Sequence, residues 1–237
     1  MVPELAVDQR VFPAAPPADL TNARVITEHD WRAFSSVGRM TDHWARPGWD
    51  LGRRSYYWML TFPQSPRLLG RVRHCRSALE HLGMDPVPDD GLHITVARIG
   101  GADEVTPADL RRLVRLVSAM PLSAFQVFAH PLAGSRGAIR FSLAPWTPLI
   151  RLHAALTTGA RSTPVPGGKP TASYRPHLGL AYNNIDRPAA PVIDAVEPLR
   201  SLPPVPLDVT HVALVELRRE GPTYQWNTLR SVPLGTK

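Results

Sequence analysis

The chain of 237 residues lacks several features that would assign it to a simple class. Its single cysteine, Cys75, excludes an internal disulfide and any multi-cysteine metal site. No apolar run is long enough to cross a bilayer, and the N-terminus lacks the basic start and apolar stretch of a signal peptide. These absences predict a cytoplasmic protein without a membrane partner.

Clusters of metal ligands are also missing, because no histidines, cysteines or carboxylates recur at the spacing of a metal site. We therefore predict neither a metal nor another cofactor. The charge is unbalanced, with 27 Lys and Arg against 20 Asp and Glu and a net charge of +7. A positive excess favours anionic partners such as nucleotides or RNA through its long-range field. Many small basic proteins bind no nucleic acid, so charge alone does not decide the partner.

Two similar stretches each place one histidine inside an apolar run. The first is GLHITVA at residues 91–97, and the second is YRPHLGLA at residues 174–181. Each is typical of a buried strand. Two histidines with near-neutral pKa values, His93 and His177, can supply an acid and a base to one reaction.

The alternation of a strand predicts which side chains accompany these histidines. Successive side chains point to opposite faces, so Thr95 and Ala97 share the face of His93. In the same way Gly179 shares the face of His177. By the same rule Tyr182 lies on the opposite face from His177. The two copies differ because Gly179 stands where the first copy has a hydroxyl.

Both halves of the chain give the same order of predicted elements. The first half predicts a strand at 56–62, a helix at 66–83, the histidine strand at 91–99, a helix that is capped by Thr106 and starts at Pro107, and a strand at 123–130. The second half predicts a strand at 137–143, a helix at 146–159, the histidine strand at 174–182, a helix at 188–200, and strands at 205–217 and 223–232. The repetition is one of architecture more than of sequence.

This repetition predicts an α+β fold of two pseudo-symmetric lobes of antiparallel sheet, with outer helices around a central cleft. We expect residues 55–237 to form this bilobal domain, acting as a monomer. Residues 1–54 are proline-rich in part and should form a partly irregular N-terminal extension and cap. Within it, Trp44 and Trp49 are expected to pack on the domain. The two histidine strands should lie side by side, which makes the cleft the natural ligand site.

The two motifs in this frame resemble the signature of the 2H phosphoesterase superfamily, and within it the 2′-5′ RNA ligase-like proteins. The resemblance covers about residues 55–233. It rests on a pair of His-x-Thr/Ser-x motifs, here HITV from His93 and HLGL from His177. The run from Asp42 to Trp58 is similar to an actinobacterial branch of this group. One motif alone arises easily by chance in a chain with nine histidines, so the two matching copies carry the resemblance.

The resemblance implies a metal-independent phosphodiesterase acting on 2′,3′-cyclic phosphate ends of RNA or nucleotides, with 2′-5′ RNA ligation as the reverse reaction. His93 and His177 would be the catalytic acid–base pair, each proton transfer contributing roughly 10²–10⁴-fold. Thr95 would donate a hydrogen bond to a non-bridging phosphoryl oxygen. The sequence does not assign which histidine is the acid.

Gly179 departs from the family pattern, and three consequences stay open. A backbone N–H or a water can replace the missing hydroxyl, since glycine allows a phosphate to approach closely. The enzyme can be slower by roughly 10–10³-fold. Alternatively the site binds a phosphate ester without turning it over, which would make the protein a non-catalytic nucleotide- or RNA-binding module. A cyclic phosphate of ADP-ribose is a further possible substrate.

Three other residues join Gly179 as candidates for substrate binding. Arg140 lies on the leading strand of the second half, where it either meets phosphate or is an exposed strand charge. Tyr57 holds the comparable place in the first half and can stack on a base. Tyr174 precedes the second motif and can stack in the same way, although packing is the alternative.

Overall fold

The computed structural model describes residues 2–45, 50–63 and 65–235. The α-helices in these ranges are α1 (Ala23–Ser35), α2 (Pro66–Leu79), α3 (Pro107–Ser118), α4 (Thr147–Arg161) and α5 (Ala190–Val196). The short 3₁₀ helices are η1 (Glu80–Leu82), η2 (Asp89–Gly91), η3 (Thr171–Ser173) and η4 (Glu197–Ser201). The strands are β1 (Arg39–Met40), β2 (Arg54–Thr61), β3 (Asp85–Pro86), β4 (His93–Gly101), β5 (Phe125–Ser135), β6 (Ala138–Ala144), β7 (His177–Tyr182), β8 (Arg187–Pro188), β9 (Val205–Val209), β10 (His211–Glu220) and β11 (Thr223–Pro233).

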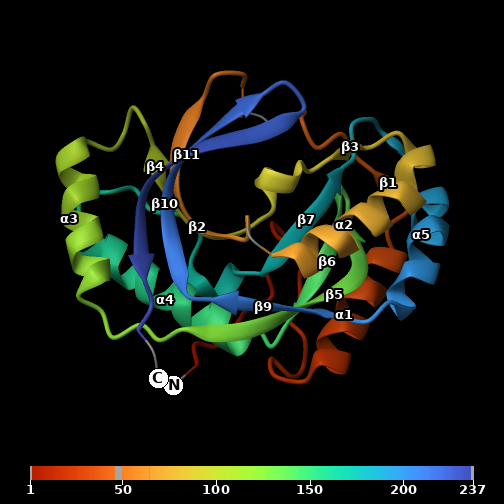
Figure 1. Ribbon diagram of the computed structural model, residues 1–237, viewed down its shortest axis with the longest axis horizontal. Coiled ribbons are helices and arrows are strands. Elements are labelled where there is room, and N and C mark those ends of the chain that lie inside the picture. Colours follow the sequence, from red (N-terminus) through yellow and green to blue (C-terminus); the bar gives the residue numbers. More distant parts are fainter. Residues whose placement is uncertain (1, 46–49, 64, 236–237) are drawn as a thin grey trace.

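The strands form two main antiparallel sheets. The first has the order β11-β10-β2-β4 and the second the order β3-β7-β6-β5-β9, while β1 and β8 make a separate small pair. Figure 1 shows the first sheet on the left and β5, β6 and β7 toward the right. Each sheet therefore contains a leading strand, β2 or β6, beside its histidine strand, β4 or β7.

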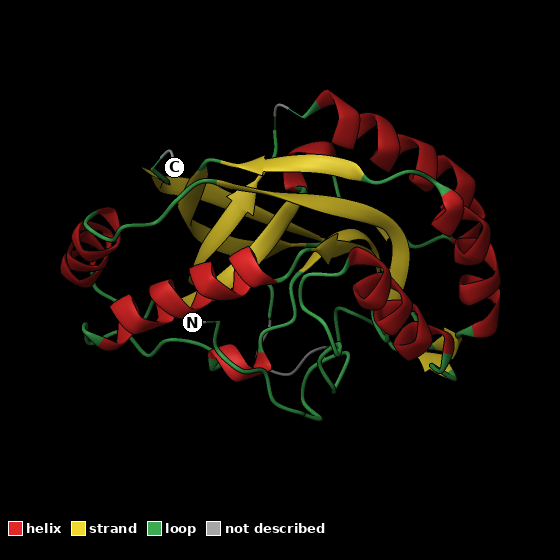
Figure 2. Cartoon of the chain, turned by 90° about the horizontal axis from the view of Figure 1, so that it is seen from below, coloured by secondary structure: helices red, strands yellow, loops and turns green. Residues whose placement is uncertain are grey.

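The helices lie around the outside of the strands, as Figure 2 shows. Helix α1 packs on β5 and β6, α2 on β7 and β9, α3 on β11, and α4 on β4. The predicted α+β class with antiparallel sheets and outer helices is confirmed. None of the helices in the described residues has the length and apolar character needed to span a membrane.

Local sequence explains why several elements begin and end where they do. Thr106 caps α3, accepting from the backbone N–H of Asp109, while the Asp109 carboxylate accepts from the Thr106 N–H. This reciprocal pair satisfies donors that a helix start leaves unpaired. Helix α2 ends at Leu79, earlier than predicted, and η1 continues the chain to Gly83, whose φ of 60° suits glycine.

Two predictions about elements were wrong. The strand expected at 205–217 is two strands, with β9 in the second sheet and β10 in the first. The chain changes sheet at Thr210, so one apolar run serves both lobes. Helix α1 was not predicted at all, although its residues Ile26 and Phe34 are fully buried. Its apolar stripe is narrow because the buried Asp30 lies between them.

The N-terminal extension packs against the rest of the chain. The Ala6 N–H donates to the carbonyl of Ala172, and β1 pairs with β8. Trp44 is buried, and its Nε1–H donates to Asp85 at 2.8 Å. The other cap residues, at positions 46–49 and including Trp49, lie outside the described residues. The division of the chain at residue 54 stays a prediction.

Candidate functional site

The two histidine strands lie side by side although they belong to different sheets. Strand β4 is the edge strand of the first sheet and contacts β7 of the second. A hydrogen bond also joins them, because the Tyr174 hydroxyl just before β7 donates to the Thr95 carbonyl at 3.2 Å. The fold therefore brings together two motifs that lie far apart in the sequence.

The two histidine rings are held in the same way. Nδ1 of His93 is 2.8 Å from the carbonyl oxygen of Gly91, and Nδ1 of His177 is 2.9 Å from that of Arg175. In both motifs the acceptor is the carbonyl two residues before the histidine. A carbonyl only accepts, so these bonds assign the proton to Nδ1 and leave Nε2 with its lone pair in the neutral ring.

Each ring lies in surroundings that favour its neutral form. Burial lowers the pKa of the half-buried His93. At His177 the pKa is lowered first by desolvation, because protein atoms around the ring displace water, and then by the charges of Arg140 and His93. His177 is nevertheless exposed to solvent on one side, and water there opposes the lowering of its pKa. The charge of a protonated His93 acts on His177, so the two rings lie near each other.

A β-bulge follows each motif at the same distance from its histidine. On β4, Thr95 pairs with Met59 and Ala97 with Trp58, which leaves Val96 as an extra residue. A bulge interrupts strict alternation, so side chains beyond it change face. Ala97 therefore joins the core face of Trp58. The expectation that Ala97 shares the face of His93 was wrong for this reason.

The bulge on β7 falls at Leu180. Gly179 pairs with Arg140 and Ala181 with Ile139, so Leu180 is the extra residue. Tyr182 pairs with Ala138, two residues before Arg140 on β6, and therefore lies on the face of Gly179. The prediction that Tyr182 points away from this face was wrong, since it assumed unbroken alternation.

The hydroxyl-bearing Thr95 and its counterpart Gly179 are both half-buried. A Cβ atom added at Gly179 would be 3.6 Å from the Tyr182 hydroxyl oxygen and 3.6 Å from Cγ2 of Val87. These are ordinary contact distances, so a larger residue fits here and close backbone packing does not require the glycine.

Arg140 is not the exposed strand charge that one alternative expected. It is buried beside Gly179 and donates to the carbonyl of Phe12 at 3.1 Å, with its guanidinium 5.4 Å from the Phe12 ring centre. Burial lowers its pKa, and the carboxylate of Asp30 opposes that effect. The charge of Arg140 reaches His177, which places a cation next to the second motif.

The two tyrosines predicted to bind substrate have different surroundings. Tyr57 is half-buried, two residues before Met59 on β2, and so lies on the face of Thr95. Tyr174 is buried, its ring stacks on His153 with centres 4.4 Å apart, and burial raises its pKa. Base stacking by Tyr174 is therefore corrected to packing, because its ring offers no open face.

Sequence reasoning missed two residues at the site. The Trp226 ring of β11 lies edge-on to His93, with ring centres 5.2 Å apart. Alternation of Tyr224 and Trp226 along β11 was the available signal. The second is Arg175, a buried guanidinium that supports the segment leading to His177. Three of its five bonds are to carbonyls of distant residues, and the sequence carries no signal for those three.

An aromatic cluster adjoins the second motif. The Tyr182 ring stacks on His43, with centres 4.1 Å apart, and meets Trp44 and Tyr224 edge-on at 5.1 and 5.4 Å. His43 Nε2 lies 2.8 Å from the Tyr224 hydroxyl. The cluster joins the N-terminal extension to both sheets.

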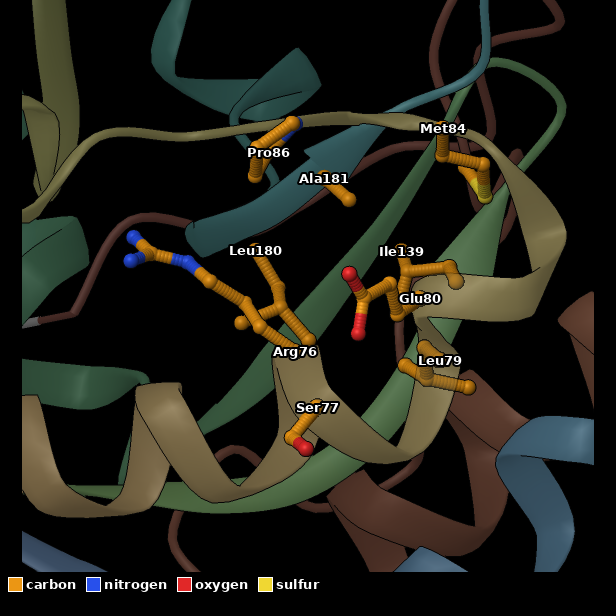
Figure 3. A pocket seen from close by; sticks show the side chains of 9 residues that line it. All are labelled: Arg76, Ser77, Leu79, Glu80, Met84, Pro86, Ile139, Leu180 and Ala181. Atoms are coloured by element: carbon orange, nitrogen blue, oxygen red, sulfur yellow. The ribbon is translucent and has the colours of Figure 1, made fainter.

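A hollow of about 410 Å³ lies elsewhere, between α2 and the second sheet (Figure 3). Leu180 and Ile139 line it, whereas neither motif histidine does. It therefore lies on the opposite face of β7 from the motif. Within the part of the chain that the structure describes, no three His, Cys, Asp or Glu side chains gather as a metal site would require.

Comparison with known proteins places most of the repeated frame in one family. Residues 63–221 match the model of the 2′-5′ RNA ligase superfamily, which covers most of the chain. A search of curated proteins finds no match.

Solved structures share the fold. E. coli LigT complexed with ATP has a TM-score of 0.56 and 18% identity, covering 78% of this chain and 99% of that one. TT0787 of Thermus thermophilus has a TM-score of 0.57 and 18% identity, covering 77% and 99%. E. coli LigT complexed with 3′-AMP has a TM-score of 0.57 and 16% identity, covering 77% and 98%.

Proposed function

This chain belongs to the 2′-5′ RNA ligase superfamily, and from that premise we propose that it opens 2′,3′-cyclic phosphate ends of RNA or nucleotides. The family supports an enzyme of phosphodiesterase or RNA-ligase type. The cyclic phosphate substrate and a reaction without a metal are our own additions. The observation that carries them is the matched support of the two histidines, each held through Nδ1 by the carbonyl two residues earlier.

The reaction uses Nε2 of both rings. A water oxygen attacks phosphorus, and the bond from phosphorus to one ribose oxygen breaks. One histidine accepts the proton that the water loses, while the other, protonated beforehand, donates a proton to the departing oxygen. When a 5′-hydroxyl takes the place of water in the attack, the same proton transfers form a 2′-5′ linkage, and each histidine keeps its role. The roles exchange only when that linkage is cleaved, because the ribose 3′-hydroxyl then attacks phosphorus and the 5′ oxygen departs with a proton.

Negative charge develops on the non-bridging oxygens during the attack, and two groups stabilise it. The Thr95 hydroxyl, two residues beyond His93 on the same face, donates to one of these oxygens. The guanidinium of Arg140, next to His177, supplies positive charge on the other side. Gly179 lets the phosphate approach the β7 backbone.

The substrate is a nucleotide or an RNA end. E. coli LigT shares the fold, and its structures include complexes with ATP and 3′-AMP. The net charge of +7 favours such anions. We assign the nucleobase of the substrate to the face of the first sheet that carries Thr95, where the half-buried rings of Tyr57 and Trp226 lie. We further propose that the enzyme is a monomer whose residues 1–54 form a partly irregular extension and cap.

The test is turnover of adenosine 2′,3′-cyclic phosphate to the monophosphate, followed by chromatography with and without EDTA. We expect wild type to be active in both conditions. His93→Ala and His177→Ala should each lower kcat by roughly 10²–10⁴-fold, because each removes one proton transfer. His81→Ala is the matched control, since His81 is an exposed histidine on η1 and its loss should leave kcat unchanged.

Two results would contradict the proposal. Turnover that survives in both motif variants would show that the histidines are not the acid–base pair. Wild type that binds the nucleotide, as measured by calorimetry, but never turns it over would favour the alternative of a non-catalytic binding module. Loss of activity with EDTA would refute only the metal-independent form of the reaction.

A further inference from the structure

We propose that the hydroxyl of Tyr182 replaces the hydroxyl that the second motif lacks at Gly179, donating a hydrogen bond to the phosphoryl group. This inference rests on the proposed phosphodiesterase function. It makes Tyr182 a catalytic residue of the second half-site, in the role that Thr95 has in the first.

The bulge at Leu180 makes this possible. In a regular strand, residues three apart point to opposite faces, so Tyr182 would face away from Gly179. The extra residue restores Tyr182 to the face of Gly179, as its pairing with Ala138 shows. The bulge therefore changes which side chain serves the site.

The distance supports the replacement. A Cβ atom built on Gly179 would lie 3.6 Å from the Tyr182 hydroxyl oxygen. The hydroxyl of a serine or threonine at that position would stand one bond beyond the same Cβ. The phenol oxygen thus lies close to the position that the missing hydroxyl would take. Because Gly179 has no side chain, a phosphate has room to reach the phenol oxygen.

The Tyr182 ring is held by the aromatic cluster around it. It is 8% exposed and stacks on His43, while Trp44 and Tyr224 pack edge-on against it. A ring fixed on several sides presents its hydroxyl without reorganisation during the reaction. Such preorganised donors are the ones that stabilise developing charge most effectively.

The first test is Tyr182→Phe, which keeps the ring packing and removes only the hydroxyl. We expect kcat to fall by about 10²-fold, the usual effect of losing one such donor, with KM changed less than about threefold. Tyr56→Phe is the matched control, because its hydroxyl faces Glu216 on the first sheet and its loss should leave kcat unchanged.

The second test restores the hydroxyl from the other position. Gly179→Ser adds a Cβ at ordinary contact distances, so the protein should accommodate it. In the Tyr182→Phe background it should recover at least about tenfold in kcat, a gain that the same substitution should not give in the wild-type background. This non-additivity distinguishes a shared donor role from two independent effects on folding.

The outcomes separate the two proposals. An inactive wild type overturns the proposed function, and the inference with it. An active wild type with undiminished Tyr182→Phe turnover overturns the inference alone. The inference is also overturned if Tyr182→Phe is slow and Gly179→Ser restores nothing, since the tyrosine would then act through packing. Thermal unfolding of each variant checks that the native fold is kept.

Discussion

Replacing Arg175 with methionine should release the N-terminal extension from the second motif. Arg175 is 6% exposed, and its guanidinium donates to five carbonyl oxygens. Three of these acceptors lie in the extension, namely Ala6 at 2.6 Å, Ala14 at 2.9 Å and Pro13 at 3.0 Å. Methionine preserves most of the apolar stem and removes all of these donors.

The expected loss follows from these bonds. A hydrogen bond from a charged donor contributes roughly 1.5–3 kcal/mol, so the three bonds to the extension sum to about 4–9 kcal/mol at face value. The freed carbonyls regain water when the extension detaches, which lowers that sum. We expect a decrease of about 3–5 kcal/mol in the free energy of unfolding, the size typical of a disrupted buried charge. For a chain of this length that is roughly 6–20 °C in Tm.

Denaturant unfolding measures the free energy, and hydrogen exchange of residues 2–20 reports whether the extension has been released. Turnover should fall as well. Loss of the guanidinium frees the backbone of residue 175 to shift, and the carbonyl of that residue holds the ring of His177. Arg10→Met is the matched control within the extension. Its side chain is 80% exposed, and its partner Asp8 keeps the hydrogen bond from the Ser173 hydroxyl, so stability should change by less than about 1 kcal/mol and exchange should not change. A loss below about 1 kcal/mol for Arg175→Met, with the extension still protected, would refute this reasoning.

Three further predictions follow from burial and protonation. Gly134→Ala should destabilise the fold by about 1–3 kcal/mol, because its Cβ would clash with the Phe34 ring. Gly70→Ala has open space around it in α2 and should stabilise the fold by about 0.5–1 kcal/mol; denaturant unfolding measures both changes. Burial lowers the pKa of His153 to about 4 from 6.5, so about 3 kcal/mol of stability that is present above pH 6.5 should be lost as pH falls through 4. His153→Gln should flatten this part of the plot of unfolding free energy against pH, and an unchanged slope in that variant would contradict the assignment. Because both motif histidines have lowered pKa values and the reaction needs one of them protonated, kcat/KM should peak below pH 6.5, and a maximum above pH 7 would count against the pair.

Local signals were sufficient for most of the fold. The alternating apolar residues around His93 and His177, and the cap at Thr106, depend on neighbours in the chain and were readable without a structure. Helix α1 was missed because the buried Asp30 interrupts its apolar stripe. The charge of that carboxylate acts on two buried arginines from distant segments and opposes the lowering of their pKa values by burial, and no local pattern records such a partner.

The sequence by itself determined the two histidine motifs, their repeated frame and the missing hydroxyl at Gly179. Residue identity and spacing fix these features, because both depend only on neighbouring positions in the chain. Only the tertiary structure decided which side chains meet at the motifs. Bulges after both histidines redirect the following residues, and they turn Tyr182 toward the glycine. Pairing between strands sets these bulges, and pairing partners come from distant parts of the chain.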